Sequence, residues 1–576
     1  MATQDEKTIM HPGSSLQVTY DTQYNVVVLS QTTLTQTPFF AKRTSLWLAA
    51  DNSGGPGVGK SHLVKVLQKI SDMMMVGEQL RSSYLGIAAV NIGGYSLCSF
   101  LDIPTNLKAG TQKIRPWNKE KLREFTSDHD LDNISSFVID EISTSGPDIV
   151  ACVDQRLQQA RANNKVFGNI AVIFLGDYDQ LPPVIGDSIP TTIVNLHRTS
   201  NNLNFLQRRQ ALSVATRGAT LFQNIQHLKL TEQHRSVDPS HTRFIQSLAR
   251  TGQISTEEMK KLYKPLAKED EQFRHATIIV SGNYERHVIN MEQSKRWAQS
   301  HKTHVLRWRR KLKEWRGKPS TVENIADATK QACFWENFVS GALGFVNYNL
   351  NTKIGIANGT GIRYHSISFE DPTKNEALLN QIENTPEGGT ITLEDPPDYI
   401  NVEMYPDLDE DSDEDSQKKK RLRKEWTYGS LDNTGHKVII PISTKGAFIK
   451  TKKEVVGGST GAGYRPSNAV LQDHFPLELA FAMTVHKAQG RTIKKLILAI
   501  SQHPLAQLQM KWESVYTALT RVRKGEDIRL LITKKQWDKL DYLSDLSKNA
   551  IIRQFFTGYP DEQGSFVRWD ADLMEE

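Results

Sequence analysis

Cysteine is scarce in this 576-residue chain, which contains only three. Cys98, Cys152 and Cys333 are widely separated in the sequence and form no CxxC pair. Neither a disulfide framework nor a cysteine-based zinc site is therefore expected. This usage is typical of a protein from a reducing, intracellular compartment.

Long apolar runs are also missing. No stretch approaches the roughly 18 apolar residues that a membrane-spanning helix needs, so we do not expect a membrane protein. Residues 1–7 are too polar and acidic for a signal or transit peptide. The chain also lacks a strong charge excess, because 71 Lys and Arg stand against 65 Asp and Glu, for a net charge of +6. This balance is compatible with a polyanionic partner without arguing strongly for one.

A glycine-rich loop is the most informative feature that is present. It matches the complete pattern G-x-x-x-x-G-K-[ST] and reads Gly54-Gly55-Pro56-Gly57-Val58-Gly59-Lys60-Ser61. The backbone N–H groups of such a loop surround nucleotide phosphates. The lysine places a positive charge beside the β and γ phosphate oxygens, and the Ser or Thr hydroxyl ligates magnesium. The apolar run 46–50 predicts a strand before the loop, and Leu63, Val66, Leu67 and Ile70 predict one face of a helix after it. Strand, loop and helix are the setting that this motif requires.

A second apolar run, residues 137–139, predicts a strand that ends in Asp140 and Glu141. In a parallel sheet, ligands bind beyond the carboxyl ends of the strands, so both carboxylates are expected beside the glycine-rich loop. Asp140 would hold magnesium, and Glu141 would orient and deprotonate the water that attacks the γ-phosphate. Solvated turn carboxylates are the alternative reading of such a pair.

A third apolar run, residues 171–175, leads into a turn that contains Gln180. Pro182 and Pro183 follow and stiffen the turn, because proline fixes the backbone angle φ. A rigidly held glutamine is suited to sensing the γ-phosphate, although a turn residue directed at water is the alternative.

Eight blocks of the sequence together resemble one known family, the superfamily 1B DNA helicases of the Pif/RecD-like type. They follow the family's order between about residues 46 and 535, at residues 54–61, 86–96, 138–143, 176–184, 230–235, 357–360, 484–492 and 516–521. The resemblance implies an α/β fold with two RecA-like P-loop domains, each built on a parallel sheet. It further implies a small wedge insertion and an SH3-like β insertion.

The same resemblance assigns an ATP site shared by the two RecA-like domains. Arg235 and Arg521 would reach the γ-phosphate from the second domain, completing a catalytic set with Lys60, Asp140, Glu141 and Gln180. An arginine suits this role because it is always charged and forks onto phosphate oxygens. ATP and Mg²⁺ are the implied cofactors, with Ser61 and Asp140 as metal ligands. The implied nucleotide contacts are Gly55, Pro56, Gly57, Val58, Gly59, Lys60, Ser61, His62, Gln489 and Gly490.

Two blocks resemble the family's contacts with single-stranded DNA. Asn91, Gly93, Gly94 and Ser96 match its first strand-binding loop, in which paired glycines let the strand approach closely. Thr484, His486 and Lys487 match a block that links the ATP site to the DNA track, and they offer hydrogen bonds and charge to a phosphate backbone. The implied partners are single-stranded and tailed duplex DNA, and translocation as a monomer stays open.

The domain organisation predicted from these blocks has six parts. An N-terminal segment (1–40) precedes the first RecA-like domain (41–200), which carries the wedge at about residues 101–115. The second RecA-like domain is split into residues 201–340 and 466–545, around the SH3-like insertion at 341–465. Residues 546–576 form a C-terminal tail.

Two stretches look added to this plan. An acidic block at 407–415 and a basic run at 418–424 have few apolar residues, which favours a disordered surface loop. A nuclear-import signal, and hence a nuclear location, or a regulatory tail is the alternative. Tryptophans among arginines at 295–316 favour a basic helix with Trp308, Leu312 and Trp315 on one stripe; base stacking on DNA is the alternative.

The expected function is ATP-dependent DNA unwinding by translocation on single-stranded DNA, with 5′ to 3′ polarity implied by the resemblance alone. An RNA helicase or a translocase that displaces proteins is a rival within the same enzyme class. An inactive nucleic-acid-binding scaffold is the rival from another class.

Overall fold

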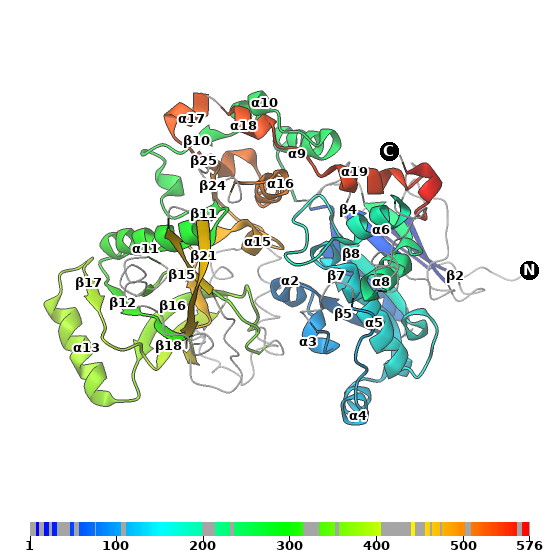
Figure 1. Ribbon diagram of the computed structural model, residues 1–576, viewed down its shortest axis with the longest axis horizontal. Coiled ribbons are helices and arrows are strands. Elements are labelled where there is room, and N and C mark those ends of the chain that lie inside the picture. The colour runs from blue at the N-terminus through cyan, green and yellow to red at the C-terminus, as the bar shows by residue number, and fades with distance from the viewer. Residues whose placement is uncertain are drawn as a thin grey trace, which may run out of the picture.

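Two α/β lobes face each other in the computed structural model, and a β-rich subdomain lies beside the second lobe (Figure 1). The structure describes residues 7–10, 16–21, 26–31, 46–50, 57–74, 77–104, 111–198, 213–230, 235–314, 332, 335–351, 356–404, 439–443, 455–460, 463–472, 475–501, 509–538, 540–560 and 567–574. None of the helices in these ranges combines the length and apolar character needed to cross a bilayer.

Lobe 1 is built on a sheet with the strand order β6-β5-β7-β8-β4-β9, in which all neighbouring strands are parallel. Its strands are β4 (Leu46–Ala50), β5 (Glu78–Ser83), β6 (Tyr95–Ser96), β7 (Ile134–Asp140), β8 (Ala171–Gly176) and β9 (Gln226–Leu230). Every residue of β8 is buried, as expected for a central parallel strand with both faces covered. The strands predicted at 46–50, 137–139 and 171–175 are thereby confirmed.

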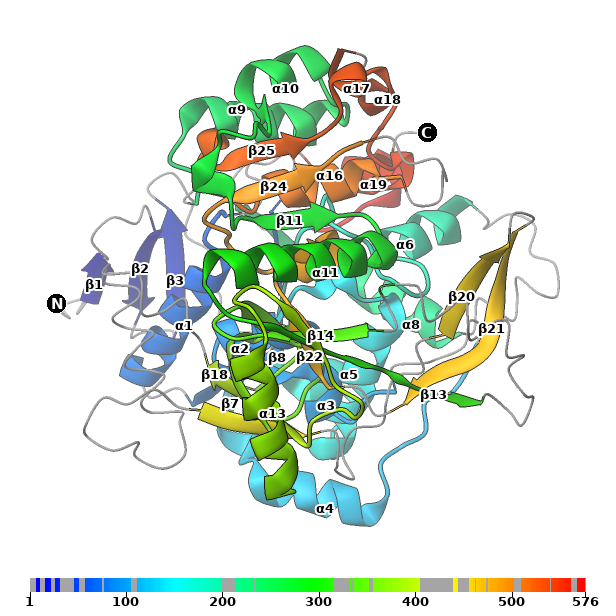
Figure 2. The same cartoon turned by 90° about the vertical axis from the view of Figure 1, so that its left-hand side faces the viewer.

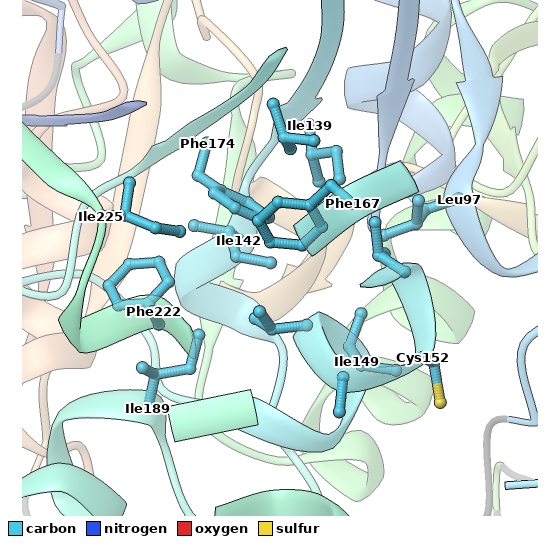
Figure 3. Close-up of a cluster of buried hydrophobic side chains, with 14 of the residues drawn as sticks. Leu97, Ile139, Ile142, Ile149, Cys152, Phe167, Phe174, Ile189, Phe222 and Ile225 are labelled. Atoms are coloured by element: carbon cyan, nitrogen blue, oxygen red, sulfur yellow. The ribbon is translucent and has the colours of Figure 1, made fainter. Parts of the chain in front are cut away.

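Helices cover both faces of this sheet. They are α1 (Lys60–Met74), α2 (Gly86–Asn91), α3 (Leu97–Phe100), α4 (Lys119–Asp128), α5 (Pro147–Ala160), α6 (Ile189–Arg198) and α8 (Val214–Gln223). Side chains alternate along a strand, so Phe137 and Ile139 pack with α5, α6 and α8 in the main core (Figure 3). Val138 points to the other face, where it packs with Leu67 of α1. This second face brings the helix after the glycine-rich loop against the sheet.

Lobe 2 repeats the plan with the strand order β10-β25-β24-β11-β23, again with parallel neighbours (Figure 2). Its strands are β10 (Lys264–Pro265), β11 (Thr277–Val280), β23 (Ala482–Thr484), β24 (Leu496–Ala499) and β25 (Ile528–Leu531). Its helices are α9 (Pro239–Thr251), α10 (Thr256–Leu262), α11 (Asn283–Ser300), α15 (Val485–Ala488), α16 (Trp512–Leu519), α17 (Lys534–Asp538) and α18 (Asp541–Ser544). The predicted fold of two P-loop-type lobes with parallel sheets is confirmed.

The β-rich subdomain centres on an antiparallel sheet with the order β19-β18-β16-β15-β22. Its strands are β15 (Leu343–Val346), β16 (Gly361–Ser368), β18 (Tyr399–Met404), β19 (Ile439–Ser443) and β22 (Leu477–Leu479), with α13 (Pro372–Asn384) beside them. A smaller sheet joins β12 (Val305–Arg309), β14 (Trp335–Val339) and β17 (Thr390–Thr392). The subdomain thus takes strands from both sides of residue 341, where the SH3-like insertion was predicted to begin.

Two further three-stranded sheets contain backbone whose side chains lie outside the described residues. One pairs β1 (Lys7–Met10), β2 (Leu16–Asp21) and β3 (Val26–Gln31) within the predicted N-terminal segment. The other pairs β13 (Lys311–Glu314), β20 (Val455–Thr460) and β21 (Gly463–Gln472).

The structure differs from the predicted domain boundaries at residues 200 and 546. Residues 213–230 form α8 and β9, which belong to lobe 1, so lobe 1 extends past the predicted start of lobe 2. In the predicted tail, α19 (Ala550–Thr557) places Ile552 and Phe555 in the core of lobe 1. Both corrections have the same cause, because the core of lobe 1 is completed by chain segments that lie beyond its motif-bearing strands in the sequence.

The helix predicted for the tryptophan and arginine stretch is wrong beyond residue 300. Helix α11 ends at Ser300, and residues 305–309 form β12. Trp308 is 1% exposed and donates its indole N–H to Glu336 Oε2 at 3.0 Å, so it offers no face to a base. The alternation of Leu306 and Trp308 with arginines fits a strand, and it outweighs the helical spacing to Leu312. Trp315 and the charged loop 407–424 lie outside the described residues.

Candidate ATP site and nucleic-acid interface

The described part of the glycine-rich loop turns sharply into α1. Gly57 and Gly59 have φ angles of 97° and 82°, a region that side chains with a Cβ rarely adopt. The N–H of Leu63 donates to the carbonyl of Gly59 at 2.8 Å, which makes Lys60 the first residue of the helix. Val58 is buried between them. The loop and Lys60 thus lie at the N-terminus of α1, where the partial positive charge of the helix dipole favours the binding of anions.

Gly55 and Pro56, together with the side chains of Ser61 and His62, lie outside the described residues. Their predicted nucleotide and metal contacts therefore stay predictions.

At the end of β7, Asp140 and Glu141 adopt different environments. Asp140 is 5% exposed, and burial followed by the charge of Glu141 raises its pKa to about 7, although Lys60 opposes this rise. Glu141 has a left-handed φ of 57° and donates its N–H to Asp140 Oδ1 at 2.8 Å. Such backbone is unfavourable for a residue with a side chain and concentrates at functional sites. Asp140 thus lies within electrostatic reach of both Glu141 and Lys60.

The turn after β8 holds Gln180 through Asp177. The Asp177 N–H donates to Ser143 Oγ at 3.1 Å, and its carboxylate accepts from the Asp179 N–H at 3.0 Å. Its Oδ2 also accepts from Gln180 Nε2 at 2.7 Å, so the amide has one orientation, with Oε1 available to an incoming donor. Gln180 is 4% exposed. This contradicts the alternative of a turn glutamine directed at water.

An arginine of lobe 2 donates the hydrogen bond that Gln180 Oε1 accepts. Arg521 Nη2 donates to Gln180 Oε1 at 3.2 Å, while its Nε donates to the carbonyl of Thr517 at 2.9 Å. Arg235 Nη1 donates to the Thr520 carbonyl at 3.1 Å, and the Arg235 backbone N–H donates to Gly57 in the glycine-rich loop at 3.2 Å. Both arginines therefore meet lobe 1 at the seam between the lobes.

The electrostatics of the seam match a polyanionic ligand. Burial, followed by repulsion from Arg521, lowers the pKa of Arg235 to about 9, while Glu141 acts in the opposite direction. Burial also lowers the pKa of Arg521. Gln489 Nε2 donates to Glu141 Oε2 at 3.2 Å and adds a further contact between the lobes. Crowded cations facing a phosphate loop gain most from a bound anion.

The structure thus brings together Lys60, Asp140, Glu141, Gln180, Arg235, Arg521 and Gln489, and their roles in nucleotide binding and catalysis stay predictions. It adds Asp177, which was absent from the predicted set even though it follows a buried strand as Asp140 does. Because the same strand-end rule applied to both residues, this signal was available in the sequence. Thr520 carries no comparable signal, since its contribution is a backbone carbonyl.

The predicted first strand-binding loop lies against lobe 2. Asn91 is exposed and donates through Nδ2 to the carbonyl of Gly490 at 3.3 Å. Gly93 has a φ of 63°, and a Cβ at Gly94 would lie 2.3 Å from the carbonyl oxygen of Arg81. The tight path of this loop therefore requires the glycine pair, independently of any DNA contact. Ser96 is buried.

The predicted blocks 86–96, 357–360 and 484–492 converge at this place. Asn349 Nδ2 donates to Ser96 Oγ at 3.4 Å, and its Oδ1 accepts from the Asn358 N–H at 2.9 Å. Arg491 donates to the carbonyl of Gly359 and lies 4.0 Å from the centre of the Phe345 ring. The β-rich subdomain thus bridges the two lobes beside α2 and α15, which face each other in Figure 1.

The second predicted DNA block begins where β23 ends. Thr484 is 8% exposed and His486 is exposed. Lys487 Nζ donates to Asn347 Oδ1 at 2.7 Å and forms an ion pair with Glu478 of β22. Glu478 also pairs with Arg286. A phosphate at Lys487 would therefore replace a protein carboxylate.

A phosphate loop, two strand-end carboxylates and two arginines from a second parallel-sheet lobe are the arrangement typical of two-lobed P-loop nucleoside triphosphatases. Comparison with known proteins narrows this class. The family model PIF1-like helicase matches residues 50–250, so this part of the chain is similar to that family.

Two relatives illustrate the similarity, one through a long alignment at lower identity and the other through a short alignment at higher identity. ATP-dependent DNA helicase Pif1 of Campylobacter jejuni is 24% identical over 500 residues, covering 85% of this chain and 90% of that protein. ATP-dependent DNA helicase PIF1 of Saccharomyces cerevisiae is 33% identical over 141 residues, which are 23% of this chain and 15% of the yeast protein. A structure of Bacteroides Pif1 bound to single-stranded DNA aligns with a TM-score of 0.55 at 19% identity, covering 92% of this chain and 96% of that one.

Proposed function

We propose that this chain is an ATP-dependent DNA helicase that translocates on single-stranded DNA, 5′ to 3′, and unwinds the duplex ahead. The observation that carries the proposal is the shared site, in which Gly57 of the glycine-rich loop, Glu141 and Gln180 of lobe 1 meet Arg235 and Arg521 of lobe 2. The relatives named above support DNA as the substrate, because they are described as DNA helicases and one is bound to single-stranded DNA.

Each residue has a role that its position supports. The loop N–H groups and Lys60 bind the β and γ phosphate oxygens, and Glu141 takes the proton of the attacking water. Arg235 and Arg521 stabilise the negative charge of the transferred phosphoryl group. Gln180 lies between Asp177 and Arg521, so it reports the state of the γ-phosphate position to both lobes.

The donor set also fits a divalent cation. Asp140 is a buried carboxylate with a raised pKa, and such a group gains stability when a cation lies beside it. We propose that Asp140, with the hydroxyl of Ser61, holds Mg²⁺. When bound, Mg²⁺ neutralises charge on the phosphate oxygens.

We propose that the DNA strand runs along the seam past Asn91, Gly93 and Gly94 on lobe 1 and Thr484, His486 and Lys487 on lobe 2. Several of these side chains or their neighbours contact the opposite lobe or the β-rich subdomain. A change in lobe separation therefore alters the DNA contacts and the ATP contacts together. This common dependence is the physical basis for coupling hydrolysis to translocation.

The proposed activity requires ATP and DNA, and we therefore propose an intracellular location. A nuclear address would depend on residues 418–424, which lie outside the described residues.

Strand displacement on duplexes with a 5′ or a 3′ single-stranded tail tests the proposal. We expect ATP-dependent unwinding of the 5′-tailed duplex, and stimulation of ATP hydrolysis by single-stranded DNA rather than by RNA. Lys60→Ala should lose hydrolysis while keeping most DNA binding, because only the phosphate contact is removed. Normal turnover in Lys60→Ala would show that the ATP site is misassigned. If RNA alone stimulates ATP hydrolysis, the substrate is RNA and not DNA. If neither nucleic acid stimulates hydrolysis, the protein is an inactive nucleic-acid-binding scaffold.

A further inference from the structure

The chain crosses between the lobes near its C-terminal end. Helices α17 and α18 lie on lobe 2, whereas α19 lies on lobe 1 (Figure 1). The crossing falls at Lys548, whose backbone N–H donates to the carbonyl of Gly252 at the end of α9, at 2.8 Å. Its side chain forms an ion pair with Asp179 of lobe 1. One residue therefore binds both lobes.

The ion pair lies directly beside the γ-phosphate sensor. Both Lys548 and Asp179 have side chains that are 1% exposed, and a buried charge that loses its partner is strongly unfavourable. Asp179 immediately precedes Gln180, and its own N–H is held by Asp177. The position of the ammonium group consequently restricts the turn that presents Gln180 to Arg521.

An apolar contact holds the same turn from α19. The ring of Tyr178 packs against that of Phe555, with centroids 6.0 Å apart, and Phe555 is completely buried. The carbonyl of Phe555 in turn accepts from the indole N–H of Trp569 at 2.9 Å. Tyr178 and Asp179, the two residues before Gln180, thus both contact the C-terminal part of the chain.

The end of this segment is fixed to the sheet of lobe 1. The N–H of Val567 donates to the carbonyl of His227 in β9 at 3.0 Å, and the His227 N–H donates back to Val567 at 2.7 Å. On the side of lobe 2, Ser547 forms a bridge with Gln253. The segment is therefore attached to both lobes by backbone hydrogen bonds.

We propose that the C-terminal strap, residues 547–560 and 567–574, is an interlobe tether in which Lys548 is a positioning residue for Gln180. Because the backbone of Lys548 follows lobe 2 and its ammonium group follows Asp179, a movement of the lobes is transmitted to the sensor turn. The strap acts on the hydrolysis step and not on the phosphate loop. This inference rests on the proposed function, since the role of Gln180 does.

Substitutions on both sides of the ion pair test the proposal in the full chain. Lys548→Met should lower kcat for DNA-stimulated ATP hydrolysis about 10-fold, with a smaller change in KM for ATP. Lys548→Arg should restore most of the rate. Adding Asp179→Asn to Lys548→Met should cost less than the two single effects combined, because no buried charge is left alone. Lys374→Met is the control, because it removes an exposed ion pair. In this pair the side chains of Lys374 and Asp395 are 48% and 58% exposed.

Amide hydrogen exchange gives a second readout that needs no activity. We expect faster exchange confined to residues 177–184 in Lys548→Met and none in Lys374→Met. A lower thermal midpoint with unchanged kcat per folded molecule would indicate a merely structural pair and overturn the proposal. If the unaltered protein shows no DNA-stimulated hydrolysis, the proposed function fails separately. Unchanged exchange at 177–184 would then still refute the strap.

Discussion

Replacing Arg521 by alanine should remove most ATP hydrolysis and leave DNA binding nearly intact. Arg521 is 2% exposed, and it donates to the Thr517 carbonyl, to Thr520 Oγ1 and to Gln180 Oε1, at 2.9, 2.8 and 3.2 Å. These contacts hold the guanidinium group at the seam on the side of lobe 2. Its described side-chain hydrogen bonds go to Thr517, Thr520 and Gln180, which are not among the residues predicted to contact DNA.

The expected loss can be estimated from this position. An arginine reaching a transferred phosphoryl group contributes about 10³- to 10⁵-fold in kcat, which is about 4 to 7 kcal/mol. Leaving Gln180 Oε1 without its donor costs about 1–3 kcal/mol of local stability. The first effect exceeds the second, so the rate should fall much further than the stability. Arg521→Lys keeps the charge but loses the fork, and it should be intermediate.

Single-turnover hydrolysis with saturating ATP and single-stranded DNA measures the rate, and fluorescence anisotropy measures DNA affinity. Arg250→Ala is a matched control, because Arg250 is an exposed arginine on α9 of the same lobe. Retention of more than about a tenth of the normal kcat by Arg521→Ala would refute the role of Arg521. An equal loss in Arg250→Ala would point to a general effect of lost charge.

Two further predictions concern DNA and pH. Lys487→Met should weaken binding of single-stranded DNA and reduce the slope of log K against log salt by about 0.7, as measured by titrations at several salt concentrations; an unchanged slope would remove Lys487 from the DNA path. His227 is buried against Tyr559, and burial, with the nearby charge of Lys229, lowers its pKa to about 3 from 6.5. The unfolded chain therefore takes up the proton first, so stability present above pH 6.5 is lost as the pH falls toward 3, by about 2 kcal/mol at pH 5. In His227→Gln the thermal midpoint should depend less on pH between pH 5 and 7.5 than in the unaltered protein. An equally steep dependence on pH would contradict this.

Local patterns were enough to group several residues of the candidate ATP site, because these residues follow strands. Lys60, Asp140 and Gln180 each follow an apolar run, so the rule that ligands lie beyond the ends of parallel strands is enough to place them together. Arg521 has no such signal and was found only through the family resemblance. The pairing of Lys548 with Asp179 was not predicted, because residues this far apart in sequence meet only through the path of the C-terminal segment.

The predicted helix at Trp308 failed for a related reason. Its spacing fitted a helix as well as a strand, and the choice was made by β14 and β17 on either side, which come from distant parts of the chain. Short apolar patterns do not separate the two periods. Tertiary pairing therefore decided the element, as it decided that α8 and β9 belong to lobe 1.

The contacts across the seam suggest how ATP and DNA can act on one equilibrium between lobe arrangements. Arg521 binds Gln180, Gln489 binds Glu141 and Asn91 binds Gly490, each by hydrogen bonds of 3.2 to 3.3 Å. Such a hydrogen bond contributes about 0.5–1.5 kcal/mol net, which is less than phosphate oxygens can provide to a charged donor such as Arg521. For Arg521 a bound triphosphate therefore more than replaces the contact with Gln180, and the neutral amides of Gln489 and Asn91 each give up one ordinary hydrogen bond. Because each contact joins two lobes, replacing it changes how the lobes are held, and this is what a motor driven by ligand exchange requires.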